Sequence, residues 1–596
     1  MRGMKPRASR CAAAALALLG LLGATPALAF IRSTLSTTDA TTIRWDLDET
    51  LQPLASVVGG EVIYTIDIAG SQNIPGTQDS EAIVRSFQHW EGIGTSRVAF
   101  LRGADQVIQA ANNDGINAVY FAEGVRTPIG GVNTNVDGFV SLTPVFTVTA
   151  GAAKGMILDA NIILNGRQFI WTVTPETAPT SFDVEAVVTH EVGHFIGLDH
   201  TGVLNATMAA RYAAGEARQR TLENDDILGA SSIYPDGDFA TRGGISGLVG
   251  RPAPVLGALI GVMDSSGNVV QESITASNGA YAAPGLVAGD YDAYVEPLDK
   301  TPPTTTNLFD ETDLGGVYTN AVDPNFFASL PLLTSVAPPA STNRSFIVGS
   351  TAPVINITKI GGRASTLAGV VFRNAPTYAF SGDTNVFLGV AGPNVSGALT
   401  FEILGSGITD NGPVQTGTVD GEPYVIHSIS VATGTPPGLR SFRVTNGALG
   451  RSYATGSLQI YAGNISMSPS APGLFLEAPT EVNSGQLPGQ NPLTVTRRGD
   501  DLDLDWDDEP GAYGYHVYRG TLASLAIGVY NHQAIPGTVN GKCAVTTSYT
   551  GLAGEALVPG DVYYLVTAWN YLGEGITGRD GTNSVLPPAS PACPAP

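Results

Sequence analysis

The hydrophobic positions between residues 30 and 236 follow two different periods. Alternation of apolar and polar side chains, as at Val62, Tyr64 and Ile66, predicts strands, and apolar positions three and four residues apart predict helices. The predicted strands are 61–68, 96–101, 116–122, 144–150 and 156–165, and the predicted helices are 80–91, 182–197 and 225–234. This mixture predicts an α+β domain in which three helices pack on a mixed, twisted sheet.

Two of the helices carry candidate caps at their first turns. Asp183 precedes the broad apolar face of the 182–197 helix, and either Asp79 or Ser80 can cap the 80–91 helix. An aspartate or serine oxygen in this position accepts a hydrogen bond from a free backbone N–H group. The 182–197 segment is the strongest helix prediction in the chain.

The pattern changes near residue 240. Helical spacing disappears, and short alternating runs are separated by Gly, Asn, Asp and Pro, which indicates an all-β region. Proline-rich breaks divide this region into about three β-sandwich modules, at residues 243–360, 364–463 and 478–596. The sequence therefore predicts a multidomain protein, with one α+β domain followed by β sandwiches.

The first 29 residues have the layout of a secretory signal peptide. Arg2, Lys5, Arg7 and Arg10 precede a short apolar run, and Ala27-Leu28-Ala29 forms a small-residue cleavage site. The apolar run is too short for a comfortable membrane span, and no later stretch is apolar enough to cross a bilayer. We expect a secreted, extracellular protein without a membrane span.

Composition narrows the choice of partners. Charged residues make up 14% of the 596 residues, and the formal net charge is −23. An acidic chain is repelled by nucleic acid, so no nucleic-acid partner is expected. Of the three cysteines, Cys11 lies in the signal segment, while Cys543 and Cys593 lie in the last module and form either a disulfide bridge or two free thiols.

Candidate chemistry is concentrated in the segment HEVGHFIGLDH, which holds three of the chain's seven histidines. His190 and His194 are one helical turn apart, so both imidazoles can reach one Zn²⁺ ion. Gly197 permits a sharp turn that can return His200 as a third ligand. Three histidines and an open position are typical of catalytic zinc, and Glu191 is placed to act as the general base that takes a proton from the attacking water.

The spacing His-Glu-x-x-His-x-x-Gly-x-x-His resembles the zinc motif of the metzincin metallopeptidases. Met208 resembles the methionine of the clan's Met-turn, and Thr201 stands where the matrixin branch usually has Ser. The segments 157–165 and 222–235 are similar to the matrixin strand before the active-site helix and to its final helix. The resemblance covers about residues 42–235 and implies a metzincin-like fold, one catalytic zinc, and a protein or peptide substrate.

The resemblance has limits in this chain. No cysteine lies between the signal segment and the zinc motif, so the cysteine latency switch of animal matrixins is absent from the sequence. His89 is the only other histidine before residue 236; it is predicted to be an exposed helix residue, which argues against a second, structural zinc. Ca²⁺ sites in loops such as 112–115 stay open, because turn chemistry explains the same Asp and Asn residues equally well.

The three β modules resemble known extracellular folds. Residues 244–295 are similar to carboxypeptidase regulatory-like domains, 364–463 to immunoglobulin-like modules, and 478–596 to fibronectin type III-like modules. Such modules can contact surfaces or glycans, or space the enzyme from them. Two functions follow: a secreted zinc endopeptidase, or an extracellular binding or adhesive protein whose metal-binding domain is not catalytic.

Overall fold

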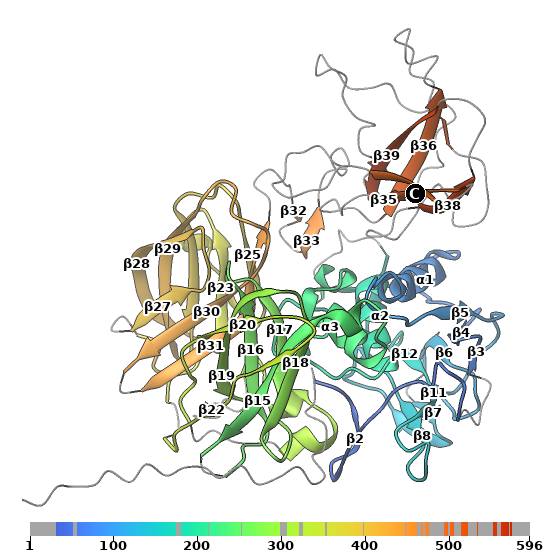
Figure 1. The fold of residues 1–596 in the computed structure, drawn as a ribbon, viewed down its shortest axis with the longest axis horizontal. Coiled ribbons are helices and arrows are strands. Elements are labelled where there is room, and N and C mark those ends of the chain that lie inside the picture. Colours follow the sequence, from blue (N-terminus) through green and yellow to red (C-terminus); the bar gives the residue numbers. More distant parts are fainter. Residues whose placement is uncertain are drawn as a thin grey trace, which may run out of the picture.

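The fold is described from a computed structural model. It describes residues 31–461, with gaps at 52–55, 125, 174–179, 213, 252, 299–306, 321–325, 352–353, 397–398 and 448, and beyond residue 461 it describes only nine strands between residues 467 and 574. Signal residues 1–29, Cys543 and Cys593 lie outside the described residues. The described protein is multidomain and mostly β, with three α-helices, which agrees with an α+β domain followed by β modules (Figure 1).

The first region is built on a six-stranded mixed sheet in the order β3-β4-β6-β12-β9, with β5 paired beside β4. Strands β4, β5, β6 and β12 run parallel, while β3 and β9 are antiparallel to their neighbours. The strands are β3 (Val57–Val58), β4 (Glu61–Ile66), β5 (Phe100–Arg102), β6 (Ala118–Phe121), β9 (Ser141–Leu142) and β12 (Ile162–Leu164). Short pairs accompany the sheet: β1 (Thr34–Ser36) with β2 (Asp39–Thr42), β7 (Arg126–Ile129) with β8 (Val132–Asn135), β10 (Val145–Thr147) with β11 (Ile157–Ala160), and β13 (Ile170–Thr172) with β14 (Ser181–Asp183).

Helices α1 (Gln78–Glu91), α2 (Val184–Phe195) and α3 (Asn224–Ile233) contribute to one core with this sheet. Alternation along β6 sends Val119 and Phe121 into the helix-facing core and Ala118 and Tyr120 into a smaller cluster on the other face. Aromatic rings cross-link the layers, because Phe87 of α1 stacks on Tyr64 of β4 with ring centroids 3.8 Å apart. Phe87 also meets Phe195 of α2 edge to face, with ring centroids 5.6 Å apart, so α1 links α2 to the sheet.

At one edge of the sheet the chain forms two consecutive short strands, β9 and β10. Strand β9 pairs with β12, and β10 pairs with β11, so residues 141–147 run antiparallel to residues 157–164. Asn161 interrupts the inner strand, and its backbone N–H group donates to Pro144 O at 3.1 Å. The predicted strand at 156–165 is therefore two strands. This edge passes alongside α2.

Two β sandwiches follow. The first packs β18-β15-β21, with β22 beside β15, on β17-β16-β19-β20 around a shared core. Its strands are β15 (Gly243–Gly250), β16 (Ala258–Asp264), β17 (Val269–Ile274), β18 (Ala280–Leu286), β19 (Gly289–Pro297), β20 (Leu332–Val336), β21 (Ser341–Asn343) and β22 (Phe346–Ile347). Short 3-10 turns lie at Glu311–Asp313 and Gly316–Asn320, between β19 and β20.

The second sandwich packs β24-β23-β26-β29-β28 on β25-β31-β30-β27. Its strands are β23 (Lys359–Ala364), β24 (Phe372–Arg373), β25 (Thr377–Phe380), β26 (Val386–Ala391), β27 (Thr400–Ile403), β28 (Ile408–Val419), β29 (Glu422–Val431), β30 (Gly438–Asn446) and β31 (Gly450–Tyr461). The remaining strands are β32 (Met467–Ser468), β33 (Ala471–Phe475), β34 (Thr494–Arg498), β35 (Asp501–Asp505), β36 (Gly514–Thr521), β37 (Gln533–Ala534), β38 (Leu552–Ala556), β39 (Val562–Asn570) and β40 (Gly573–Glu574). In the part of the chain that is described, no helix has the length and apolarity to cross a bilayer.

Local predictions hold for the helices and differ at one cap. Asp183 caps α2 by accepting a hydrogen bond from the backbone N–H group of Ala186 at 2.8 Å, as expected. The cap predicted for the first helix is wrong. Helix α1 begins after Thr77, and Asp79 instead accepts from the backbone N–H group of Ser71 at 2.6 Å, which ties the preceding loop to the helix.

Candidate metal centre and active-site cleft

Three histidines meet at the end of α2. His190 and His194 lie one turn apart on the helix, and His200 returns after the turn at Gly197. The Nε2 atom of His194 lies 3.2 Å from the Nε2 atom of His190 and 3.2 Å from that of His200. Among the described residues, this trio forms the group of histidine and acidic side chains whose ligand atoms lie close enough to hold a metal ion.

The proton positions on these rings follow from their partners. His190 Nδ1 donates to Thr207 O at 2.7 Å, His194 Nδ1 to Leu198 O at 2.9 Å, and His200 Nδ1 to Asp313 O at 2.5 Å. Carbonyl oxygens only accept, so each Nδ1 carries the proton and each Nε2 presents a lone pair. Burial first, and the neighbouring imidazole of His194 next, lower the pKa values of His190 and His200, which favours the neutral form that binds metals.

This donor set fits zinc. Lone pairs that face one another at 3.2 Å repel unless a cation lies between them. Two nitrogens bound to one tetrahedral zinc at 2.0–2.1 Å stand about 3.3–3.4 Å apart, close to the separation found here. Each ligand also has the hydrogen-bonded partner that orients imidazoles in zinc sites. The match of chemistry and spacing supports a metal at this point.

The turn after α2 has strict steric requirements. Gly197 has φ +101°, and a Cβ atom there would lie 2.6 Å from Ile43 O, so a side chain would be strained and crowded. Two buried side chains hold the free carbonyls at the end of the helix. Trp45 Nε1 donates to Phe195 O at 2.9 Å, and the Tyr234 hydroxyl donates to Ile196 O at 2.8 Å. Both contacts direct the chain toward His200.

Met208 lies directly beneath the histidines. It is 2% exposed, and its sulfur occupies the space that a Cβ atom on Gly193 would need. Asp226 of α3 holds this turn by accepting backbone N–H groups from Thr207 at 2.8 Å and Met208 at 3.0 Å. Met208 therefore packs under the site from a turn that is anchored in the core.

Glu191 points toward the sheet edge beside the histidines. The Ser141 hydroxyl donates to its Oε1 atom, and the Thr143 hydroxyl donates to its Oε2 atom at 2.5 Å. The side chain is 5% exposed, so these hydroxyls are its main polar environment in the described structure. Both donors come from the β9 edge, which links the carboxylate to that strand.

A cleft with a volume of about 490 Å³ opens over this group. The three histidines and Glu191 form its floor, together with residues 138–143 and Val145 on the sheet edge. Ser33, Val187, Ala210, Tyr212 and Gln219 complete the lining. The histidines, the carboxylate and the edge strand therefore share one surface that is open to solvent.

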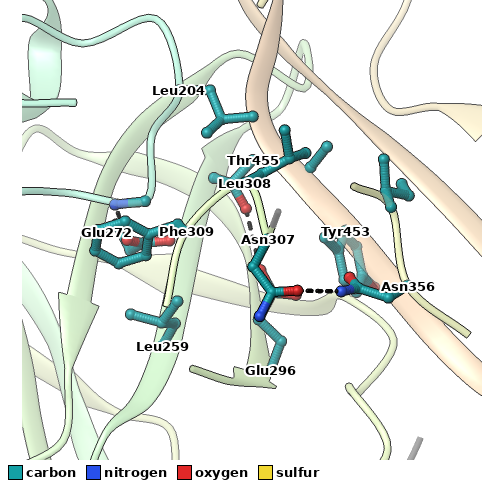
Figure 2. A pocket seen from close by; sticks show the side chains of 13 residues that line it. Leu204, Leu259, Glu272, Glu296, Asn307, Leu308, Phe309, Asn356, Tyr453 and Thr455 are labelled. Atoms are coloured by element: carbon teal, nitrogen blue, oxygen red, sulfur yellow. Dashed lines mark hydrogen bonds between the residues drawn. The ribbon is translucent and has the colours of Figure 1, made fainter. Parts of the chain in front are cut away.

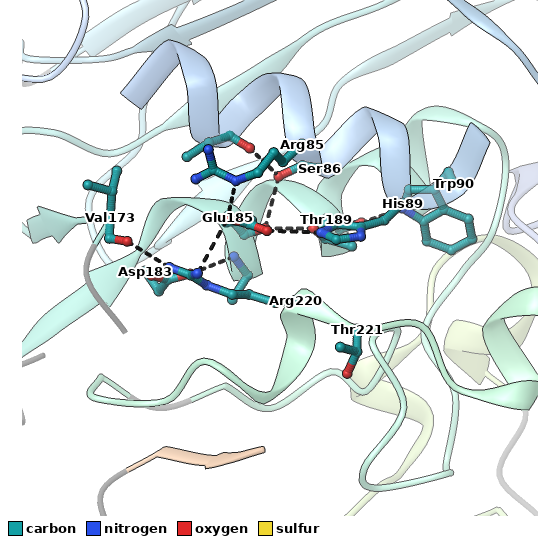
Figure 3. A network of polar contacts seen from close by, with 12 residues as sticks. Arg85, Ser86, His89, Trp90, Val173, Asp183, Glu185, Thr189, Arg220 and Thr221 are labelled. Atoms are coloured by element: carbon teal, nitrogen blue, oxygen red, sulfur yellow. Dashed lines mark hydrogen bonds and ion pairs between the residues drawn. The ribbon is translucent and has the colours of Figure 1, made fainter. Parts of the chain in front are cut away.

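A buried ionic network supports α2 from the other side (Figure 3). Glu185 is 1% exposed, and its carboxylate contacts Arg85 at 2.8 Å, His89 at 2.9 Å and Arg220 at 3.4 Å. Burial alone would raise the pKa of Glu185, but the neighbouring cations outweigh it and hold the pKa well below its usual value. His89 was expected to be exposed, and this is wrong: its ring is largely covered and bound to Glu185.

The predicted site residues therefore meet. His190, Glu191, His194 and His200 line one cleft, and Gly197 and Met208 lie directly beside or beneath them. The sequence patterns did not indicate Ser141, Thr143, Thr207 or Asp313, since each acts through a hydroxyl or a backbone carbonyl. A hydroxyl pair at positions i and i+2 before a proline, as in Ser141-Leu142-Thr143-Pro144, was the available signal.

Comparison with known proteins identifies this region. A cleft with converging imidazoles and an adjacent carboxylate is the arrangement of the zinc-dependent hydrolases. Residues 132–235 match the family model described as Matrixin. The metalloendoproteinase 5-MMP of Arabidopsis thaliana is 34% identical over 83 residues, which is 13% of this chain and 22% of that protein. The predicted matrixin resemblance is confirmed over residues 132–235, and it supports a zinc metallopeptidase in general terms.

The chain spans about a fifth of the length of that relative. Among solved structures, the titin domains z1z2 in complex with telethonin are 15% identical, cover 33% of this chain and 86% of theirs, and give a TM-score of 0.11. A titin structure named Titin-A168169 is 16% identical, covers 33% of this chain and 88% of its own, and gives a TM-score of 0.16. TM-scores this low carry no structural argument, so the module-level assignments of the β region stay predictions.

Proposed function

We propose that this chain is a zinc-dependent endopeptidase that cleaves peptide bonds in protein or peptide substrates. The observation that carries the proposal is the convergence of three Nε2 lone pairs beside Glu191 on the floor of an open cleft. His190, His194 and His200 would hold one zinc ion, and the matrixin match over residues 132–235 supports that choice of metal.

Zinc, when bound, supplies Lewis acidity, which polarises a carbonyl oxygen and lowers the pKa of water. Glu191 accepts one proton from the attacking water as its oxygen bonds to the peptide carbonyl carbon. The same carboxylate then delivers that proton to the peptide nitrogen. The C–N bond breaks, leaving one carboxyl and one amine terminus. Ser141 and Thr143 hold the two oxygens of Glu191 in place during this transfer.

We propose that substrate binds in extended form along residues 141–147. Strand β9 ends the strand order of the six-stranded sheet, and β10 follows it in a two-stranded pair with β11. Ser141, Leu142, Thr143 and Val145 line the cleft. An extended peptide can add to such an edge through main-chain hydrogen bonds. This mode is tolerant of sequence, so the side chains that line the cleft, including Tyr212 and Val187, would set the preference.

Cleavage of an unfolded protein substrate tests the proposal. Purified chain should cut the substrate, and Glu191→Ala should lower the rate by at least 10²-fold while retaining about one zinc per chain, because general base catalysis typically contributes 10²–10⁴-fold. Met263→Leu, a volume-conserving change in the first sandwich, provides a control that should cut like the wild type. Zinc binding without cleavage by the wild type would contradict the peptidase proposal and favour the binding or adhesive function.

We also propose export, with cleavage after Ala29. The support is the charged, apolar and small-residue order of residues 1–29. N-terminal sequencing of protein recovered from the growth medium should begin at Phe30. Recovery of only intracellular protein with an intact Met1 would contradict it. The bridge between Cys543 and Cys593, and surface or glycan contacts through the β modules, belong to the same extracellular proposal.

A further inference from the structure

The partner of the third histidine comes from a different part of the chain. The carbonyls that orient His190 and His194 belong to Thr207 and Leu198, both within the matrixin-like region. The carbonyl that orients His200 belongs to Asp313, which lies in the connection between β19 and β20 of the first sandwich. A residue 113 positions away therefore sets the tautomer of this ring.

The same connection holds the neighbouring residue. Asp199 Oδ2 accepts the backbone N–H group of Gly315 at 3.1 Å, and its Oδ1 atom accepts the N–H group of His200 at 2.8 Å. The Asp313 carboxylate pairs with Arg211 at 3.0 Å, just beyond the Met208 turn. Side-chain and backbone contacts therefore join residues 313–315 to both sides of the metal centre.

The N-terminal strand closes this arrangement. The backbone N–H group of Val317 donates to the Thr34 hydroxyl at 3.1 Å. The Ser33 hydroxyl in turn donates to Leu198 O at 2.9 Å, and the N–H group of Asp199 donates to Ile31 O at 2.9 Å. The loop that carries His200 is thus held between the start of the described chain and the 310–317 segment.

The 310–317 segment is fixed to its own sandwich. The buried side chains around it form one cluster: Ile31, Leu259, Ile274, Leu298, Phe309, Leu314 and Tyr318. At the junction, Glu272 of β17 accepts the backbone N–H group of Gly202 at 2.8 Å, and Phe309 lies beside this contact (Figure 2). A rigid attachment lets the sandwich determine where the Asp313 carbonyl lies.

We propose that residues 310–317 are a positioning element of the metal site, so that the site is complete only when the first β sandwich is docked on it. The inference rests on the zinc site proposed above. Without the Asp313 carbonyl, the His200 ring is free to rotate or to move its proton to Nε2, and either change removes a ligand. Loss of such an orienting partner typically lowers metal affinity by 10- to 100-fold.

Gly316→Ala in the full chain tests this role. Gly316 has φ +59°, and a Cβ atom there would collide with the Thr34 hydroxyl, so the substitution pushes the segment away from the N-terminal strand. Competition with a chelator should show about a 10- to 100-fold lower zinc affinity. Gly279→Ala is the matched control in the same sandwich. It has φ +75° and a collision with Val249 O, and it should leave zinc affinity unchanged even where thermal stability falls.

Thr34→Val provides a milder variant that decides the question where Gly316→Ala does not fold. It removes only the acceptor for Val317, and zinc affinity should fall by about 2- to 10-fold. Wild-type affinity in both variants would overturn the inference, as would a wild-type chain that binds no zinc. Zinc affinity is measured without substrate. The test therefore decides this inference even when the chain does not cleave peptides.

Discussion

Glu191, which we propose as the general base, illustrates how a single side chain depends on contacts from other elements. A general base has to keep its lone pairs aimed at the substrate, and a long side chain does not hold one rotamer without contacts. Ser141 and Thr143 supply these contacts from the sheet edge, one hydroxyl for each oxygen. Hydroxyls at this edge also place the base next to the strand that we propose binds the peptide.

The combined change Ser141→Ala and Thr143→Val should lower kcat by about 10- to 100-fold, because hydrogen bonds to a charged group are worth about 1.5–3 kcal/mol. Zinc content should stay at the wild-type level, since neither hydroxyl contacts a histidine in the described structure. Steady-state kinetics with a peptide substrate measure the effect. Ser246→Ala, an exposed hydroxyl in the first sandwich, should change nothing. An unchanged kcat in the double variant would contradict the proposal that the two hydroxyls position Glu191.

Asp159 predicts a pH dependence of stability. Burial raises its pKa to about 7, although the backbone N–H groups of Asp114 and Gly115 oppose the shift. A carboxyl whose pKa is higher in the folded chain stabilises it below about pH 4 and loses that contribution as the pH rises toward 7. Asp159→Asn should therefore flatten the decline of unfolding free energy between pH 4 and 7 in urea titrations. A variant with the wild-type slope would contradict the assignment.

Helix α2 is the element on which the site depends. One face carries two histidines and Glu191, the opposite face carries Glu185, and its N-terminus is capped by Asp183. Arg220 contacts both acids, at 2.6 Å from Asp183 and 3.4 Å from Glu185. A buried charge network under the helix fixes its axial position, and with it the position of the histidines.

Glu185→Gln should destabilise the chain by about 3–5 kcal/mol, because it removes the buried carboxylate that Arg85, His89 and Arg220 share. Denaturant unfolding followed by tryptophan fluorescence reports the change. Glu81→Gln, on the exposed face of α1, should alter stability by less than about 1 kcal/mol. Similar losses of unfolding free energy in the two variants would contradict the stabilising role of the ionic network.

On the scale of the chain, the matrixin-like region and the first two sandwiches share buried contacts. One apolar cluster joins Val203 and Ala206 to Met263 and Tyr294 of the first sandwich and to Leu439 and Tyr453 of the second. Tyr294 and Tyr453 stack with ring centroids 4.0 Å apart. Shared cores of this kind couple the unfolding of the parts that they join.

Tyr294→Ala should therefore cost about 3–5 kcal/mol, as expected for a buried aromatic side chain, and should affect more than its own sandwich. In calorimetry, one transition containing the matrixin-like region and both sandwiches should move to lower temperature. A variant in which only one of several separate transitions moves would contradict the coupling.

Local patterns were sufficient for the helices, the metal-ligand spacing and the cap at Asp183. Each depends on residues within a few positions of one another, where helix geometry fixes the distances. The shorter strands, the interruption at Asn161 and the missed cap of α1 depend on pairing and on contacts with distant loops. His89 was misjudged for the same reason, because its partner Glu185 is 96 positions away.

The spacing of His190, Glu191, His194, Gly197 and His200 determines which side chains converge, because one helical turn and one glycine are enough to bring three imidazoles together. The fold determines which groups orient them. Ser141, Thr207 and Asp313 come from separate elements, and most of them contribute backbone carbonyls that every residue possesses. A backbone carbonyl cannot be recognised from the type of residue that carries it. The proposed dependence of the metal site on the first sandwich is therefore visible only in the tertiary structure.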